Sequence, residues 1–383
     1  MRKRRVLVAT GGGDCPGLNA VISAIVRRAA RENEWEVFGC KESFNGILKD
    51  NFDLGKDLIN LTEMLSENNM AGFHARGGTI LKTVNKGGPF LYPKFDKEGR
   101  PVLGADGGQE TENRADIMKQ RLEEHGFEAV INIGGDGSQK ISAQLQKIGI
   151  NMIGVPKTID NDLSSTDFTF GFQTAVQIAS DALDRLVTTA DSHNRTFIME
   201  VMGRDAGWIA LHAAISGGAD VCLIPEIQYD PQKIAKKICS RYNGNEGFCT
   251  IVIAEGARNQ KGMNMGQFEI GEVDPNVHYS GAADRLMNEL KNEQLPHEIR
   301  LTVLGHLQRG GTPVAYDRVL ATAYGVKAFE MVLNKDFGCM VAYRHPNYIA
   351  VPFAEAIAQT HLVNPSLDYL VKTAKGIGMS FGD

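Results

Sequence analysis

The sequence predicts an α/β protein built from two Rossmann-like, three-layer units, each with a mostly parallel β-sheet between helices. Short runs of β-branched and apolar residues alternate with helical patterns along most of the chain, which is typical of parallel sheets. Glycine-rich turns follow several of these runs, at the strand ends where such sheets bind ligands. The 383 residues are more than one hydrophobic core usually organises, so two units are expected.

Each expected element follows from its local pattern of apolar residues. Strands are short runs rich in β-branched residues, and helices are longer segments whose apolar residues recur with a helical period. The expected strands are Val6–Ala9, Glu36–Cys40, Ala129–Ile133, Asn151–Val155, Thr196–Val201, Val221–Pro225, Thr250–Ala254 and Arg300–Gly305, and the expected helices are Asn19–Arg31, Ser138–Ile148, Gly171–Ala190, Trp208–Ile215 and Asp317–Leu333.

The segment Lys86–Thr111 breaks this alternation. It is rich in glycine, proline and charged residues, which predicts a long loop, with a hairpin at Asp96–Arg100. Loops of this length are usually functional or disordered.

The composition argues against several classes of protein. The net charge of −5 provides no basic surface for nucleic acid or membrane. No apolar run approaches the roughly 18 residues of a membrane span, and the run after MRKRR is too short for a secretory signal. The six cysteines form no C-x-x-C pair, so we expect reduced thiols in a cytoplasmic protein.

Two glycine-rich turns are candidate phosphate sites. The first, in Thr10–Ile22, runs from a strand end into a helix, where unpaired amides attract phosphate oxygens. It matches neither a Walker A loop nor G-x-G-x-x-G, and a tight turn is the alternative. The second, in Ile131–Lys140, contains Asp136, which suits Mg²⁺ together with phosphate oxygens, or else caps the helix. Gly137 lets a ligand lie against the backbone.

The octet Val155–Asp162, VPKTIDND, places charged residues at the end of a strand. Asp160 is a candidate base for a hydroxyl that attacks phosphorus, because phosphoryl transfer needs an oriented nucleophile and neutralised charge. Lys157 would add a cation near the phosphates. The alternative is that the acids of this octet only pair with a nearby arginine.

Arginines bracket two further strands. Arg195 and Arg204 lie on either side of Thr196–Val201, and arginine forks suit phosphate. A single arginine is usually only a surface charge. Glu255, at the end of another strand, suits sugar hydroxyls or an ion pair. The other bracketed strand is Arg300–Gly305, which begins with Arg300 and is followed by His306 and Arg309.

The order of these motifs resembles that of the 6-phosphofructokinase family. GGGDCPGLN, GGDGS, PKTIDND, MGRDAG, AEGA and GHLQRGG follow one another over about residues 5–330. The resemblance implies a glycolytic phosphotransferase that uses ATP-Mg to phosphorylate the 1-hydroxyl of fructose 6-phosphate, giving fructose 1,6-bisphosphate and ADP. It also implies an active-site cleft between a nucleotide- and Mg-binding domain, residues 1–171 and about 308–358, and a fructose 6-phosphate domain, residues 172–307 and about 359–383.

The resemblance also implies a role for each matching residue. Asp160 is the implied base, Arg204 stabilises the charge that develops on phosphorus, and the Gly12 amide contacts the transferred phosphoryl group. Asp136 is the implied Mg²⁺ ligand. The implied nucleotide contacts are Gly12, Asn85, Lys86, Gly135, Asp136, Gly137 and Ser138, and the implied substrate contacts are Thr158, Ile159, Asp160, Arg195, Met202, Gly203, Arg204, Glu255, Arg300, His306, Leu307, Gln308 and Arg309.

Two of the phosphate-binding arginines, Arg195 and Arg300, are supplied by a neighbouring subunit in the family, so a homodimer or homotetramer is implied. The chain departs from short bacterial members in three places. Asn85 and Lys86 stand where those members carry an arginine, the loop from Lys86 is longer, and Asn243–Cys249 lacks the lysines of the bacterial allosteric pocket. Control by phosphoenolpyruvate and ADP is therefore not expected.

The two residues that distinguish ATP users from pyrophosphate users in the family, Gly137 and Lys157, point to different phosphoryl donors. ATP users generally carry glycine at the positions of Gly137 and Lys157, and pyrophosphate users carry aspartate and lysine. An aspartate at position 137 would occupy and repel the nucleotide α-phosphate, so Gly137 favours ATP, with pyrophosphate as the alternative. Lipid and NAD kinases share GGDG but lack TIDND and HLQRGG. A catalytically silent nucleotide or sugar-phosphate sensor is a remote alternative.

Overall fold

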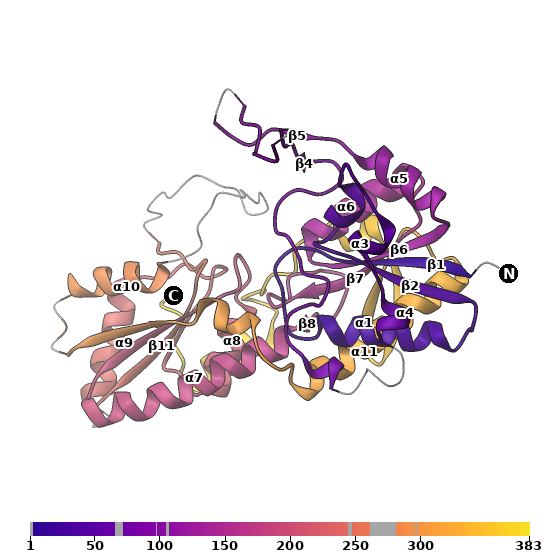
Figure 1. The fold of residues 1–383 in the computed structure, drawn as a ribbon. Coiled ribbons are helices and arrows are strands. Elements are labelled where there is room, and N and C mark those ends of the chain that lie inside the picture. Colours follow the sequence, from indigo (N-terminus) through magenta and orange to yellow (C-terminus); the bar gives the residue numbers. More distant parts are fainter. Residues whose placement is uncertain are drawn as a thin grey trace. The chain divides into compact units, whose positions relative to one another are not determined.

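The computed structural model describes residues 3–65, 72–96, 98–104, 107–243, 247–260, 281–293, 295 and 297–383 (Figure 1). Contacts within the chain define two compact α/β units. The first unit comprises Met1–Thr158, Leu163–Gly171 and Gly310–Gln359, and the second comprises Ile159–Asp162, Phe172–Arg309 and Thr360–Asp383. The main difference from the expected boundaries is Ile159–Asp162, which groups with the second unit rather than with the strand that precedes it.

A mixed, mostly parallel sheet forms the centre of the first unit. Its strands are β1 (Arg4–Thr10), β2 (Trp35–Cys40), β3 (Leu58–Asn60), β6 (Phe127–Gly134), β7 (Met152–Thr158), β8 (Phe170–Gly171), β13 (Cys339–Arg344) and β14 (Asn347–Pro352). They lie in the order β14-β13-β7-β6-β1-β2-β3, with β8 paired to β7. Only β3 and β14, at the two edges, run antiparallel to their neighbours. The central strands are continuous apolar runs because both faces of the sheet are buried.

Helices cover this sheet. They are α1 (Leu18–Ala30), α2 (Asn45–Leu48), α3 (Leu54–Asp57), α4 (Leu61–Met64), η2 (Phe73–Ala75), α5 (Ala115–Glu124), α6 (Asp136–Lys147), α11 (Ala315–Asn334) and α12 (Phe353–Ala356). Helices α1 and α11 lie side by side (Figure 1). A Cβ atom at Gly325 would lie 2.5 Å from the Val21 carbonyl oxygen, so this close helix packing requires glycine there.

The second unit has a four-stranded, fully parallel sheet. Its strands are β9 (Thr196–Val201), β10 (Val221–Leu223), β11 (Cys249–Ala254) and β12 (Ile299–Val303), in the order β10-β11-β9-β12. Its helices are α7 (Phe172–His193), α8 (Trp208–Ser216), α9 (Pro231–Asn243), α10 (Ala282–Lys291), η3 (Gly305–Arg309) and α13 (Tyr369–Gly376).

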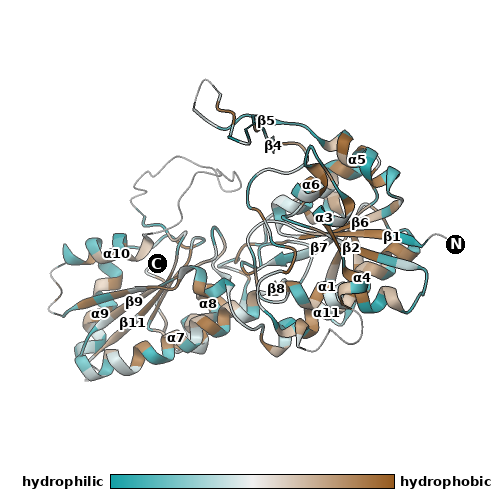
Figure 2. Cartoon of the chain, in the orientation of Figure 1, coloured by the Kyte–Doolittle hydropathy of each residue, from teal (hydrophilic) through white to brown (hydrophobic). Residues whose placement is uncertain are grey.

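Successive side chains of β11 point to opposite faces of the second sheet and show which helices cover each face. Ile251 and Ile253 belong to a buried cluster with residues of α9 and α10, and Val252 between them is buried on the opposite face. Helices α7 and α8 pack against each other, and both contact β11. The strands of the two large sheets are mostly hydrophobic, and several helices carry both hydrophilic and hydrophobic residues (Figure 2). The expected layered α/β fold is therefore confirmed.

The expected hairpin inside the long Lys86–Thr111 loop is present. Strands β4 (Tyr92–Pro93) and β5 (Thr111–Glu112) pair, Phe95 bridges Pro101, and the Asp96 amide donates to the Arg100 carbonyl oxygen at 2.9 Å. Residue 97 in this turn lies outside the described residues. The hairpin of β13 and β14 was not expected from the sequence, although both strands are rich in β-forming residues.

The sequence predicted that the chain has no membrane span and that its cysteines are reduced thiols. None of the helices in the described part of the chain combines the length and apolar character that crossing a bilayer requires. All six cysteines lie in described segments, none of them forms a disulfide, and four of them are buried. Burial raises the pKa of the Cys40 thiol to about 12, which agrees with an inert core thiol.

Candidate functional site

The glycine turn after β1 lies against a second segment of the first unit. Gly12 has φ +78°, its amide donates to the Val84 carbonyl oxygen at 3.1 Å, and the Thr83 hydroxyl donates to the Gly12 carbonyl oxygen at 2.6 Å. Asn85 and Lys86 follow directly and are exposed. The structure therefore brings two of the expected nucleotide contacts to the Gly12 turn, a proximity that sequence separation hides.

The turn after β6 leads into α6. Asp136 is the first residue of this helix, is half-buried, and pairs with Lys140 at 2.7 Å. Gly135 and Ser138 flank it, so the amides of the first helical turn face the same end as the carboxylate. A Cβ atom at Gly137 would meet nothing within 4 Å. Space is therefore open next to Asp136.

Asp136 is the candidate metal ligand. No cluster of three or more His, Cys, Asp or Glu side chains suited to a metal ion occurs in the described residues. A half-buried carboxylate beside open space fits Mg²⁺, which uses one or two carboxylates and takes its other ligands from water and phosphate.

Lys157 lies at the end of β7, beside β6. Gly134 of β6 pairs with Pro156, and Thr10 of β1 pairs with Ile133, so the three strands end together. The Lys157 side chain is only 5% exposed, and its ammonium group donates to the Gly13 carbonyl oxygen at 2.5 Å. Its nitrogen would be 3.5 Å from a Cβ atom at Gly12. The cation is thus held against the glycine turn.

The two loops with the strongest catalytic candidates meet in the second unit. The Asp160 carboxylate lies 3.9 Å from the Arg204 Nε, with the Asp160 side chain 9% exposed and the Arg204 side chain 50% exposed. Arg204 has φ +52°, and Asn161, next to Asp160, has φ +54°. Left-handed backbone at non-glycine residues costs energy and concentrates at functional sites.

Glu255 shapes the turn that carries Arg204. Its Oε1 accepts hydrogen bonds from the amides of Gly203, at 3.3 Å, and Arg204, at 3.0 Å. Burial raises the pKa of Glu255 to about 7, and the nearby charge of Asp160 adds to the shift. The next residue back, Met202, donates its amide to the Gln308 side chain at 2.8 Å. The structure therefore gathers these predicted substrate contacts around one turn.

The cationic candidates occupy opposite ends of the second sheet. His306 and Arg309 lie in η3, just after β12, beside the carboxyl ends of the strands. Arg195 and Arg300 lie near the amino ends of β9 and β12, and both form ion pairs with Glu298. At about 3.3 Å per residue, the length of a strand keeps the two groups roughly 20 Å apart. Arg195 and Arg300 therefore do not join His306 and Arg309 within one chain.

The remaining predicted substrate contacts are Thr158, Ile159 and Leu307. The Thr158 carbonyl oxygen accepts a hydrogen bond from the Thr169 hydroxyl at 2.7 Å. Ile159 is 3% exposed, so its side chain belongs to the core. Leu307 is 70% exposed.

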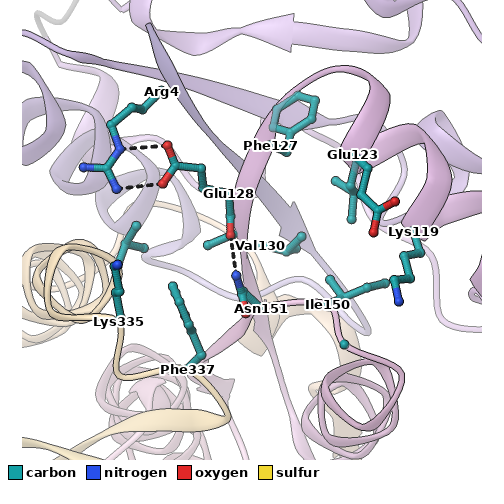
Figure 3. Close-up of a pocket in the computed structure, with 14 residues that line it drawn as sticks. Arg4, Lys119, Glu123, Phe127, Glu128, Val130, Ile150, Asn151, Lys335 and Phe337 are labelled. Atoms are coloured by element: carbon teal, nitrogen blue, oxygen red, sulfur yellow. Dashed lines mark hydrogen bonds and ion pairs between the residues drawn. The ribbon is translucent and has the colours of Figure 1, made fainter.

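A cavity in the first unit lies away from all of these residues (Figure 3). It has a volume of about 360 Å³ and is lined by residues at the amino ends of β6 and β7, including Glu128 and Asn151. Arg4 forms two hydrogen bonds with Glu128, at 2.7 and 2.6 Å. None of the predicted site residues lines this cavity, so it adds nothing to the candidate site.

Three residues that the sequence did not single out as site residues hold the turns of Asp160 and Arg204. His361 bonds to the backbone of Asn161 and Asp162, Trp208 stacks on His361, and Glu226 binds the Gly207 amide. Trp208 directly follows the MGRDAG motif and was expected to be a core residue, and no motif marks His361 or Glu226. His361 is far along the chain from the loop it contacts, so only the folded chain reveals the connection.

The positions of the candidate site residues in the two units indicate the class of protein. Each of the two α/β units has a mostly or fully parallel sheet. Glycine turns, a helix amino end, carboxylates and arginines lie at the carboxyl ends of these strands, which is the arrangement of an α/β phosphotransferase.

The chain belongs to the phosphofructokinase family, whose profile matches residues 5–332. It is 42% identical over 380 residues to ATP-dependent 6-phosphofructokinase 2 of Clostridium perfringens, covering 99% of each protein. It is 44% identical over 384 residues to ATP-dependent 6-phosphofructokinase of Chloroflexus aurantiacus, covering 100% of this chain and 99% of that one. It is also 41% identical over 364 residues to pyrophosphate–fructose 6-phosphate 1-phosphotransferase of Streptomyces coelicolor, covering 95% and 97%.

Solved structures of phosphofructokinases have the same fold as this chain. The crystal structure of Pichia pastoris phosphofructokinase superimposes with a TM-score of 0.73 at 26% identity, covering 93% of this chain and 35% of that longer chain. The expected family and fold are confirmed.

Proposed function

We propose that this protein is a glycolytic 6-phosphofructokinase that transfers the γ-phosphoryl group of ATP to the 1-hydroxyl of fructose 6-phosphate. The observation that carries the proposal is the buried Asp160 carboxylate beside the Arg204 guanidinium. The names and full-length similarity of the Clostridium and Chloroflexus relatives support it.

In the proposed mechanism, Asp160 accepts the proton of the 1-hydroxyl as the hydroxyl oxygen bonds to the γ-phosphorus. The bond from that phosphorus to the bridging oxygen of ATP breaks, and ADP leaves. Arg204 stabilises the charge that develops on the transferred group, because a fixed cation needs no reorganisation during the reaction. The amino end of α6 binds phosphate oxygens of the donor, and the Gly12 amide would join it by exchanging its bond to the Val84 carbonyl oxygen for one to phosphate. Glu255, Met202 and Gly203 orient the sugar.

We assign Mg²⁺ to Asp136, whose pairing with Lys140 would have to adjust when the metal-bound donor enters. Bound there, Mg²⁺ would neutralise phosphate charge. Asn85, Lys86, Gly135, Gly137 and Ser138 complete the proposed nucleotide site of the first unit.

We further propose that the enzyme is a homodimer or homotetramer. His306, Arg309, Leu307 and Gln308 would bind the sugar phosphate from one subunit, and Arg195 and Arg300 would reach a neighbouring subunit's site. The positions of these two arginines at the opposite ends of the strands support this division.

Pyrophosphate is the second candidate donor. Lys157 against the Gly12 turn supports it, as does the similarity to the Streptomyces enzyme. The open space at Gly137 favours ATP. The test is the kcat/KM for phosphorylation of fructose 6-phosphate with ATP-Mg and with pyrophosphate-Mg. A higher value with ATP-Mg is expected. A higher value with pyrophosphate-Mg would reverse the donor assignment, and no transfer from either donor would favour a silent sensor.

A further inference from the structure

The C-terminal segment of the second unit reaches both catalytic turns. The His361 amide donates to the Asp162 carbonyl oxygen at 2.8 Å, and the His361 Nδ1 lies 2.9 Å from the Asn161 carbonyl oxygen. A carbonyl oxygen can only accept, so Nδ1 carries the proton in this contact. His361 therefore binds the two residues that follow Asp160.

The same histidine is fixed to the helix that follows Arg204. The His361 ring stacks on Trp208, with centroids 4.7 Å apart and planes 29° apart, and the Trp208 indole donates to the His361 carbonyl oxygen at 2.8 Å. Trp208 is 6% exposed and is the first residue of α8. The loop carrying Asp160 and the start of this helix are thus joined through one side chain.

Glu226 makes a second connection between the same parts. Its Oε1 accepts from the Gly207 amide, in the turn after Arg204, and from the Val363 amide, each at 2.9 Å. Its Oε2 is buried and has no hydrogen-bond partner among the described residues. Burial raises the pKa of Glu226 to about 7, and because Oε1 accepts both bonds, a protonated or ionised carboxyl group can make them.

We propose that these four residues, His361, Trp208, Glu226 and Val363, form a C-terminal brace that positions the Asp160 loop and the Arg204 turn for phosphoryl transfer. The inference rests on the proposed function of Asp160 and Arg204. His361 and Glu226 are positioning residues, because they act through the backbone of those turns. Both turns contain a residue with strained, left-handed backbone, and such conformations persist only where surrounding contacts hold them.

A positioning role for the brace predicts a specific change in kinetics, which a general loss of stability does not predict. A shifted base and a shifted arginine weaken interactions made in the transition state, whereas the sugar-phosphate contacts remain. Loss of the brace should therefore lower kcat and leave the KM for fructose 6-phosphate nearly unchanged.

Two pairs of variants test it. His361→Phe keeps an aromatic ring against Trp208 but removes the Nδ1–H donor, and His361→Asn restores a donor near that position. Glu226→Leu removes the acceptor, and Glu226→Gln keeps it. His345→Phe, at an exposed histidine of the first unit, is the matched control. The measurements are kcat and KM with ATP-Mg, the melting temperature, and amide hydrogen exchange of peptides covering residues 158–163 and 203–208.

We expect His361→Phe and Glu226→Leu to lower kcat roughly ten- to a hundredfold, with KM changed by less than about threefold. Amide exchange in the two peptides should become faster. His361→Asn and Glu226→Gln should stay within about threefold of the unsubstituted kcat, and His345→Phe should have no effect. If one variant of a pair does not fold, the other pair decides the question.

The proposal is overturned if both His361→Phe and Glu226→Leu keep kcat within about twofold, or raise KM without lowering kcat. Unchanged amide exchange in both peptides also overturns it. If the unsubstituted protein transfers no phosphoryl group from ATP or pyrophosphate, the proposed function fails instead, and the exchange measurement still decides whether the brace holds the two turns.

Discussion

The Asp160 carboxylate lies 3.9 Å from the guanidinium of Arg204, although the two residues come from different strand ends in the sequence. The acid is almost buried and the arginine is half-exposed. A desolvated carboxylate beside a fixed cation suits the removal of a proton and the stabilisation of a developing negative charge. The kinetic consequences of this pair can be tested separately.

Asp160→Asn removes the proposed proton acceptor and nearly preserves its shape. We expect kcat for fructose 6-phosphate phosphorylation to fall by roughly 10²–10⁴-fold with a modest change in KM, because general base catalysis contributes at about that level. Steady-state kinetics measure it. Asp184→Asn, at an exposed carboxylate of α7, is the control and should be neutral. Near-normal turnover of Asp160→Asn would refute the base assignment.

Arg204→Ala removes the proposed stabilising cation. We expect kcat to fall by roughly 10²–10³-fold, as for loss of a group that stabilises transition-state charge. The melting temperature should change little, because the side chain is 50% exposed. Arg258→Ala is a close control, since Arg258 is 51% exposed and pairs with Asp205 in the same unit. Equal losses in the two variants would contradict a specific role for Arg204.

Gly137→Asp tests donor selection. The new side chain meets no protein atom at its Cβ, so the fold should tolerate it. We expect kcat/KM for ATP to fall by at least about tenfold relative to that for pyrophosphate, because a like charge beside a phosphate is worth more than about 1.4 kcal/mol when partly desolvated. Gly376→Asp adds the same charge at another open glycine and should leave the ratio unchanged. An unaltered ratio in Gly137→Asp would remove Gly137 from the donor assignment.

Glu255 predicts a pH dependence of stability. Burial raises its pKa from 4.5 to about 7 in the folded protein, so between these values the folded state holds a proton that the unfolded state has released. The free energy of unfolding should therefore fall as the pH rises through this window.

In Glu255→Gln this contribution is absent, and we expect the fall in unfolding free energy between about pH 5 and 8 to be smaller by roughly 1–3 kcal/mol. Denaturant titrations at the two pH values measure the difference. Glu123→Gln, at an exposed carboxylate, should retain the full slope. An equal slope in Glu255→Gln and the unsubstituted protein would show that Glu255 is not the group responsible.

The sequence predicted the strands and helices around the site closely. Strand β9 was expected at Thr196–Val201 and occurs there, because five of its six residues are β-branched or apolar. Contacts group the four residues Ile159–Asp162 with the second unit, whereas the sequence placed them with the first, since a continuous stretch of chain carries no mark of which core it contacts. The β13–β14 hairpin was missed because a short apolar run does not by itself distinguish a strand from a buried helix segment.

By itself, the sequence determined the family, the layered α/β fold and the residue types needed for phosphoryl transfer, because local periodicity and motif order are written along the chain. Only the tertiary structure decided that Lys157 binds the turn after β1, that Glu255 holds the Arg204 turn, and that His361 reaches the Asp160 loop. Those contacts join residues that are distant in the chain, and their geometry depends on how the strands pair and the helices pack.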